Sequence, residues 1–495
     1  MADDTPRVTD ALSDYVATCV DRPLPDEISE LARHHLLDTL AAVVACRDLP
    51  AARLAVRYAV AQSGGAAAPV PILAAGTRAG LVDAVFASAM AGHAAEVNDF
   101  CPSAYVQPGP AVVSTALGVA GMRGGDGRAV LRGIVAGYEL ACRVPKALGA
   151  RNLRTAGLAN HGVGPVFGAA ATASALLGLS ATQVASVWAY SAQQASGSWQ
   201  WRLDVDHIEK AFVFAGMGAR NGLQAALLVE AGMTGVPEAL DVPGGWLGAG
   251  PFGRPGSDLD RAGLVAGLGE RFELPLVGIK RYPVGGPTQP AVQALLELLA
   301  DPALDDPALA GTASTPASEA PVVRPDLALS RACRDRLVES IEAIRIDMPG
   351  RTDAFATAEM PALNLPYLCA VIVLDGGLDV ESSQARERML ADPAVRDLMA
   401  RVTVTHDPAQ EREPRAESAR GTVELVDGRT VSRFVAEVEG YPSHPMPGAA
   451  VEAKARGLLA PALGERGADR VVDLVAGIED LPSVEPLVAA LEPAP

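Results

Sequence analysis

A mainly α-helical fold, in which a helical domain is interrupted by a smaller α+β domain, is the fold class that the sequence predicts. The chain has 495 residues, too many for one ordinary hydrophobic core, which favours two or more domains. Hydrophobic residues make up 49% of it but aromatic residues only 4%, as in closely packed helices of small side chains. Helical patterning gives way to a mixed segment and then returns, so we expect a discontinuous helical domain.

The first part of the helical domain covers residues 1–274. Two helical patterns follow each other between residues 9 and 60, and the second opens with a proline and two acids at 25–27, which suit a helix N-terminus. Apolar helical patterns rich in Ala, Gly and Leu then recur at 81–93, 110–122, 127–148, 166–177, 181–194 and 219–231. The Gly- and Pro-rich stretch 242–258 is predicted to be a loop or a connection to the next domain.

The smaller domain, residues 275–445, has a mixed α/β texture. Residues 339–348 alternate between apolar and polar side chains, as in a half-buried strand. Residues 423–435 contain two strand-like runs around Asp427 and Gly428, a pair that strongly favours a hairpin turn. These patterns predict a small sheet in this domain.

Two further segments complete the predicted organisation. Residues 301–326 are rich in Pro, Ala, Ser and Thr and offer little to bury, so we expect a mobile insertion. Helical patterning returns at 446–495, and we expect this segment to dock on the first helical part.

The charge and the cysteines exclude several classes of function. A net charge of −18 argues against a nucleic-acid partner, and it means that a small anionic substrate needs a locally cationic pocket. The six cysteines show no CxxC pair and no metal-ligand spacing, so we expect neither disulfides nor a metal site. The N-terminus lacks the pattern of a signal peptide, and no apolar run predicts a membrane span. A cytoplasmic location is expected.

Histidines and lysines provide the first candidates for chemistry. His161 lies in a Gly-rich stretch that we expect to be a loop directly before a helix, where it could share a pocket with an anion or merely cap the helix. His207 and Lys210 are three residues apart, on one face if the segment is helical, and the apolar residues after Lys210 favour a desolvated ammonium. A salt-bridged surface turn is the alternative. His406, in a charged connector, and His444, in a Pro-rich turn, are expected to be solvated or structural.

The segment 277–289 combines adjacent cations with glycines before a helix. Lys280 and Arg281 precede a turn with Gly285 and Gly286, and the helix is expected to begin near residue 287. Cations, accessible backbone and a helix start together suit a carboxylate or phosphate. An ordinary junction with two solvated cations is the alternative, and a Walker A loop is excluded because the Lys precedes the glycines.

Polar groups also follow the helix that ends near residue 93. Glu96, Asp99 and Gln107 lie in the Pro-punctuated stretch that connects it to the next helix. Such groups often face water. If this loop lines a pocket, they are candidates to orient a hydroxyl group or a catalytic cation of the protein.

The order of these motifs resembles the MmgE/PrpD family over nearly the whole chain. The resemblance rests on the acidic segment before Gln107-Pro108-Gly109, the histidine before a helix, the EKAF and ARNG segments, and the KRYP turn with its glycines. The family includes 2-methylcitrate dehydratase, cis-aconitate decarboxylase and iminodisuccinate epimerase. The resemblance implies a discontinuous helical domain with a smaller α+β lid, and a homodimer.

The resemblance also implies roles for individual residues. His161 matches the catalytic histidine of the family, Lys210 its lysine on the following helix, and Lys280 the lysine at the start of the lid. The segment 359–367 is similar to the lid segment that supplies polar groups and a tyrosine, which makes Tyr367 a catalytic candidate and Asn364 a binding candidate.

Two departures from the family bear on the reaction. Gln107 replaces the histidine of the family's HPG loop, and the acidic cluster is altered to Glu96-Val97-Asn98-Asp99. Glutamine transfers no proton at neutral pH, so a reaction that needs two histidines is disfavoured, and a variant substrate or a one-base reaction is favoured.

The residues suit a lyase or an epimerase, and the resemblance implies a cofactor-free lyase, of dehydratase or decarboxylase type, that acts on a small di- or tricarboxylic acid, because the family's known reactions are mostly of that class. Proton transfer next to a carboxylate develops negative charge, which Lys210, Lys280 and Arg281 can stabilise while His161 and Tyr367 move protons. An epimerase or isomerase of a dicarboxylate is the alternative within the enzymes. A diverged member that only binds carboxylates is the non-enzymatic alternative, supported by Gln107 alone.

Overall fold

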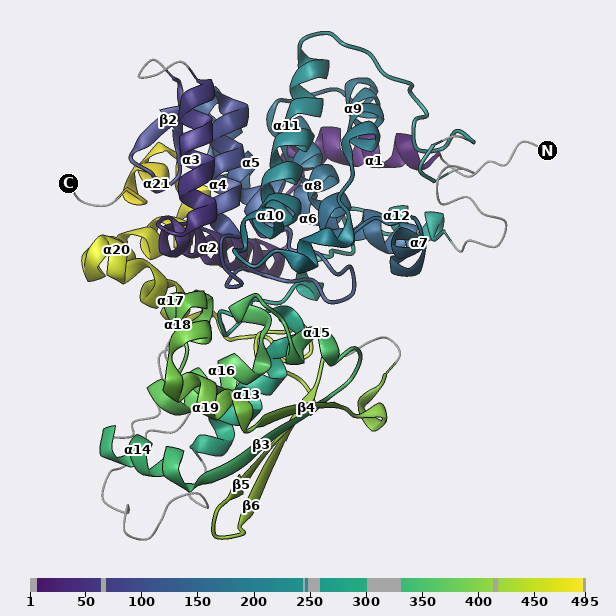
Figure 1. Ribbon diagram of the computed structural model, residues 1–495. Helices are drawn as coiled ribbons and strands as arrows, with labels where there is room; N and C mark the ends of the chain where they lie inside the picture. Colours follow the sequence, from purple (N-terminus) through teal and green to yellow (C-terminus); the bar gives the residue numbers. More distant parts are fainter. Residues whose placement is uncertain are drawn as a thin grey trace.

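The computed structural model describes residues 7–63, 68–243, 245–247, 259–300, 331–412 and 417–492. The insertion predicted at 301–326 lies outside the described residues. The mainly helical fold with a smaller α+β lid is confirmed, and Figure 1 shows the helical domain above the lid.

The helical domain is built around α8 (Asn160–Leu176), which packs against both α6 (Gly127–Leu148) and α11 (Met217–Glu230). Glycines allow the close contacts between them: a Cβ on Gly137 would lie 2.2 Å from Thr172 Oγ1, and one on Gly222 would lie 2.3 Å from the carbonyl oxygen of Val166. The main helices of the first part are α1 (Val8–Thr18), α2 (Asp26–Cys46), α3 (Pro50–Gln62), α4 (Leu81–Gly92), α5 (Gly109–Arg123), α6 (Gly127–Leu148), α8 (Asn160–Leu176), α9 (Ala181–Gln194) and α11 (Met217–Glu230). The small residues therefore serve helix packing, as predicted.

Three details of this domain differ from the sequence-based prediction. Residues 9–60 form three helices rather than two, because Pro50 begins the separate helix α3. A short antiparallel hairpin, β1 (Val70–Ile72) and β2 (Thr77–Ala79), was not predicted. Helix α8 begins at Asn160, six residues earlier than the expected start at 166.

The lid contains a four-stranded sheet in the order β4-β3-β5-β6, with α16 (Leu365–Asp375) and α19 (Pro393–Ala400) packed together beside it. The strands are β3 (Ile341–Met348), β4 (Val402–His406), β5 (Ala419–Leu425) and β6 (Thr430–Val435). β3 is parallel to β4 and antiparallel to β5, and β5 and β6 form the predicted hairpin, in which Gly428 adopts a φ of 86°. α13 (Gln289–Leu299) packs on β5 and β6.

The prediction that His406 lies in a connector was wrong. His406 is the last residue of β4 and pairs with Met348 in the parallel register. The charged residues that follow it obscured a strand of only five residues, Val402–His406. The part of that prediction that concerns exposure is confirmed, because the ring is exposed and its Nε2 lies 2.9 Å from Glu411 Oε1.

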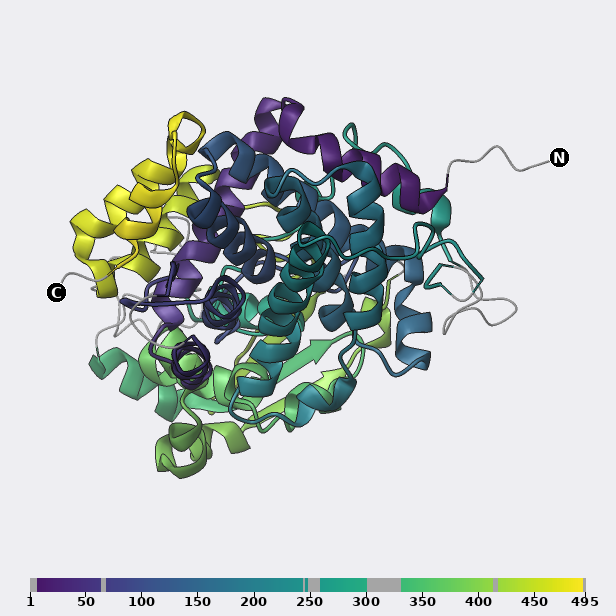
Figure 2. The ribbon, with the colours of Figure 1, turned by 90° about the horizontal axis from the view of Figure 1, so that it is seen from above.

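The C-terminal segment returns to the helical domain, as Figures 1 and 2 show for the yellow helices beside α2. α20 (Gly448–Ala476) and α21 (Glu485–Ala490) contribute apolar residues to the same core as α2 and α6. A buried ion pair reinforces the contact: Lys454 Nζ lies 2.5 Å from Asp38 Oδ1 and donates to the carbonyl oxygen of Val97 at 2.8 Å. The helical domain is therefore discontinuous in sequence.

One helical stretch, Ile208–Glu230, is long and apolar enough to cross a membrane by length and composition, and 72% of its apolar window is buried inside the protein. It packs against α4, α8 and α9, as a core helix does.

Replacement of Lys454 by Met tests the docking of the C-terminal segment. The change leaves the Asp38 carboxylate buried without its cation, which costs roughly 3–5 kcal/mol of the free energy of unfolding. Urea unfolding followed by tryptophan fluorescence measures it, because all four tryptophans, Trp188, Trp199, Trp201 and Trp246, lie in the helical domain.

Arg456→Met on the same helix is the matched control. The Arg456 side chain is 40% exposed and pairs with Asp469 at 2.8 Å and Glu452 at 3.1 Å. Its loss should therefore lower the free energy of unfolding by no more than about 1 kcal/mol. Equal effects of the two variants would contradict the structural role of Lys454.

Candidate active site

The loop between α4 and α5 carries the first part of the site. Phe100 exchanges two backbone hydrogen bonds of 2.8 Å with Gly278, which brings the segment before the lid against this loop. Lys454 holds the loop from the other side through the carbonyl oxygen of Val97. A segment near residue 97 and a segment near residue 280 are thereby placed side by side, although they are far apart in sequence.

Glu96 is the centre of a buried cluster of charges. Its Oε1 contacts the ammonium of Lys210, and its Oε2 lies 2.7 Å from Lys280 Nζ. The Nε2 of His207 lies 3.3 Å from Glu96 Oε1. All four side chains are buried, with exposed fractions of 3% or less. One carboxylate therefore faces two ammonium groups, which leaves an excess of positive charge.

Lys210 reaches this cluster from the start of a long helical stretch. Asp204 accepts a hydrogen bond of 2.8 Å from the Lys210 backbone N–H and so holds the first turn, α10 (Ile208–Ala211). A π-helical turn, η3 (Phe212–Gly216), follows and continues into α11. Lys210 Nζ lies 5.1 Å from the ring centroid of Trp201 and 5.2 Å from that of Phe214, so aromatic faces surround the ammonium.

His161 lies in the first turn of α8 and not in a loop before it, which corrects the prediction. Its Nδ1 lies 2.9 Å from Gln107 Oε1. Its ring stacks on Phe214 at 3.9 Å and 10°, and it meets Trp201 edge-on at 5.5 Å. Within the described ranges, Nε2 of His161 has no hydrogen-bond partner. One ring nitrogen is thus occupied and the other remains for a ligand.

Burial and charge set the protonation of these groups. Burial lowers the pKa of His161 well below its ordinary value of 6.5, and the charge of Lys210 lowers it further. Burial also lowers the pKa of Lys210, with Glu96 opposing this effect. Burial alone would raise the pKa of Glu96, but Lys210 and Lys280 hold it well below its usual range. A neutral imidazole therefore lies near an ionised carboxylate and its ammonium partners.

A cavity of about 450 Å³ opens between the helical domain and the lid. Glu96, Gln107, His161 and Lys210 line it from the helical domain. The lid contributes residues from two segments, 285–287 and 351–363. The structure thus brings four of the predicted residues to one cavity, together with Gly285 and Gly286.

Other predicted residues support the site from behind. Lys280 and His207 contact Glu96 but do not line the cavity. Asp99 accepts hydrogen bonds from Tyr138 Oη at 2.6 Å and from the Gly109 N–H at 3.2 Å, so it holds the loop. A Cβ on Gly109 would lie 2.9 Å from Asp99 Oδ1, which explains the glycine.

The structure does not bring Tyr367, Asn364 or Arg281 to the cavity. Tyr367 Oη donates to the carbonyl oxygen of Ser382 at 2.6 Å inside the lid, and burial raises its pKa to about 12. Asn364 caps α16, accepting from the Tyr367 N–H at 2.9 Å. Arg281 forms an ion pair with Glu439. The N–H of Gly285 donates to the carbonyl oxygen of Ala362 at 3.1 Å. Gly286 is therefore the candidate for a backbone contact with a substrate.

Sequence reasoning missed the aromatic wall of the site. Tyr105, Trp201 and Phe214 surround His161, and Met360 Sδ from the lid lies 4.0 Å from Lys210 Nζ. Tyr105 has a φ of 56°, uncommon for a residue other than glycine. In a chain with only 4% aromatic residues, the aromatic residues near Gln107 and Lys210 in sequence were the available signal.

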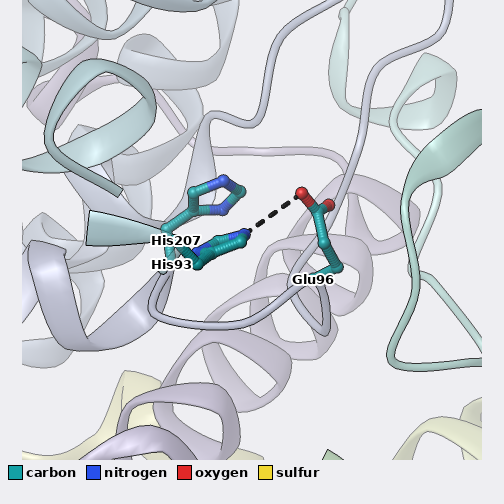
Figure 3. A group of neighbouring side chains, drawn as sticks. All are labelled: His93, Glu96 and His207. Carbon is teal, nitrogen blue, oxygen red and sulfur yellow. Dashed lines mark hydrogen bonds and ion pairs between the residues drawn. The ribbon is translucent and has the colours of Figure 1, made fainter. Parts of the chain in front are cut away.

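His93, Glu96 and His207 lie closely enough to suggest a metal site, with ligand atoms within 4.8 Å of one another (Figure 3). His93 Nδ1 lies 2.7 Å from Asn98 Oδ1, and its Nε2 is buried without a partner in the described part of the chain. However, a divalent cation on Glu96 would lie beside the ammonium groups of Lys210 and Lys280, and like charges at this distance repel strongly in a buried site. The charges favour the lysines over a metal as partners of Glu96.

Chelation tests this conclusion. Because the lysines occupy both oxygens of Glu96, the purified protein should contain no stoichiometric divalent metal by elemental analysis. Its thermal unfolding midpoint should be the same before and after dialysis against EDTA. A bound metal whose removal lowers the midpoint, and which the His93→Ala variant no longer binds, would contradict the ammonium assignment.

Comparison with known proteins agrees with the predicted family. The MmgE/PrpD N-terminal domain model matches residues 10–250, and the MmgE/PrpD C-terminal domain model matches residues 323–480. The chain is 24% identical to a cis-aconitate decarboxylase-like protein, oryM, of Aspergillus oryzae, over 99% of each chain. It is 23% identical to a cis-aconitate decarboxylase of Aspergillus terreus, over 98% of this chain and 96% of the relative. With both domain models matched across most of its length, this chain belongs to the MmgE/PrpD family.

Proposed function

We propose that the protein is a lyase that acts on a small di- or tricarboxylic acid by proton transfer at the carbon next to a carboxylate. One observation carries the proposal: His161, with an unpartnered Nε2, lines the same cavity as Lys210, which is ion-paired to Glu96. A neutral imidazole is a base, and the excess of positive charge in the cluster suits an anionic acid.

The residues divide the work of an elimination between them. His161 Nε2 takes a proton from the carbon next to the carboxylate, and the electron pair of the C–H bond moves into the carboxylate. Lys210 stabilises this negative charge from the cavity wall. Lys280, which contacts Glu96 but does not line the cavity, adds to the positive potential. The lowered pKa of Lys210 also makes its ammonium a better proton donor to a departing hydroxyl group. Loss of water then completes the reaction.

Decarboxylation is the second form of the same proposal, and the names of both relatives favour it. In that reaction the electron pair of the C–C bond stays on the substrate as carbon dioxide leaves, and the carbon takes up a proton. His161 must then be protonated at the start. The negative charge of a bound acid favours that state of the imidazole.

An epimerase remains the alternative, because Gln107 adjoins His161 and cannot itself transfer a proton. A single base can epimerise a carbon without a second acid when the planar intermediate turns over before the base returns the proton to its opposite face. Dehydratase, decarboxylase and epimerase reactions all pass through an intermediate with delocalised negative charge, so the products distinguish them.

A substrate screen in deuterated water tests the function. Proton NMR of the protein with methylcitrate, cis-aconitate and aspartate-derived acids should show a new unsaturated or decarboxylated product. Deuterium exchange without net product indicates the epimerase. Shift perturbation with neither product nor exchange would contradict the enzyme and support a binding protein.

Removal of His161 should slow turnover strongly while the fold remains. A general base contributes on the order of 10²- to 10⁴-fold, so His161→Ala should lower kcat by about that factor. His406→Ala, which removes an exposed histidine of the lid, is the control. Activity of His161→Ala within about threefold of the unaltered protein would exclude His161 as the base.

The pH profile follows from the charges that face His161. Burial and Lys210 lower its pKa, Arg202 and Lys280 act in the same direction, and Glu96 opposes them. A base with a lowered pKa stays unprotonated to lower pH, so kcat/KM should fall only below pH 6.5. A loss of kcat/KM as the pH rises, instead of as it falls, would show that His161 starts the reaction as the imidazolium.

A further inference from the structure

We infer that Gln107 is a positioning residue that holds His161 in the tautomer with the proton on Nδ1, so that Nε2 is the reacting nitrogen. This inference rests on the proposed function and adds a role for a residue that has no proton to transfer. It is carried by the contact of 2.9 Å between Gln107 Oε1 and His161 Nδ1. Both side chains are buried and line the cavity.

The contact determines where the proton of a neutral imidazole lies. An amide oxygen only accepts hydrogen bonds, so Nδ1 must be the donor when Oε1 faces it. A neutral ring carries one N–H, which leaves the lone pair on Nε2. The absence of any partner for Nε2 in the described ranges agrees with an acceptor that is kept for a ligand.

No other neighbour of the His161 ring among the described side chains fixes its tautomer. Phe214 stacks on one face at 3.9 Å and has no polar side-chain atom, and Trp201, at 5.5 Å and 89°, makes no hydrogen bond to the imidazole. Lys210 lies nearby as a donor only and is held by Glu96. Among the contacts of the described side chains, only Gln107 makes a hydrogen bond to His161.

Gln107 also has a second polar group. Its amide Nε2 makes no hydrogen bond within the described part of the protein, although the side chain lines the cavity. A donor in that place suits a substrate carboxylate or hydroxyl oxygen. Gln107 can thus fix the tautomer of His161 through its amide oxygen and contact the substrate through its amide nitrogen. A histidine in its place would add a second titratable group.

Nitrogen NMR of His161 tests the inference without turnover. In protein with ¹⁵N-labelled histidine, with His161→Ala used to assign the signals, Nδ1 should appear as the protonated nitrogen and Nε2 as the unprotonated one at neutral pH. In Gln107→Met, of similar shape but without the acceptor, this preference should be lost. A proton on Nε2 in the unaltered protein, or an unchanged tautomer in Gln107→Met, would overturn the inference.

Kinetics separate positioning from folding. Gln107→Met should lower kcat by roughly 10- to 100-fold, by analogy with the loss of partners that orient metal-bound histidines. Gln410→Met, at a buried glutamine of the lid whose amide donates to the Asp347 carbonyl oxygen at 3.0 Å, should leave kcat unchanged. If the proton is on Nδ1 of His161 but no acid is turned over, only the proposed function is refuted. If an acid is turned over but the proton is on Nε2, only the role of Gln107 is refuted.

Discussion

The ion pairs of one buried carboxylate, Glu96, organise the whole site. Two ammonium groups, from Lys210 and Lys280, are costly to bury unless a counter-charge is present. Glu96 supplies that charge but only one unit of it, so the cluster stays positive and can attract an acid. The negative charge of the protein as a whole makes this local excess necessary, because the average surface repels the same acid.

The fold serves to bring these groups together from three parts of the chain. Glu96 lies on the loop after α4, Lys210 on α10, and Lys280 on the segment that leads into the lid. The backbone pairing of Phe100 with Gly278 joins the first and third parts, and Lys454 from the C-terminal return holds the loop against α2. The discontinuous helical domain is thus tied to the site itself, since its last segment braces the loop that carries Glu96.

Much of the fold could be predicted from the sequence, because local patterns of residues predict the helices with apolar faces and the hairpin around Asp427-Gly428. The short strand β4 could not be predicted, because five residues followed by a charged stretch are too few to show a clear alternation of apolar and polar side chains. Among site residues, the surroundings of Lys210 were predicted because apolar neighbours in sequence are also neighbours on the same helix. The partners of Arg281 and Tyr367 were not, because Glu439 and Ser382 take them through contacts that only the folded lid creates. The family, first suggested by motif order, is confirmed over both domains.

A crystal structure of the protein with a four-carbon dicarboxylate such as succinate tests the central claim most directly. We expect one carboxylate of the acid within hydrogen-bond distance of Lys210 Nζ, the Glu96 contacts to both lysines retained, and the carbon skeleton facing the His161 ring. An acid bound outside this cavity, or a cavity in which Lys210 has left Glu96 and the acid contacts neither lysine nor imidazole, would contradict the account.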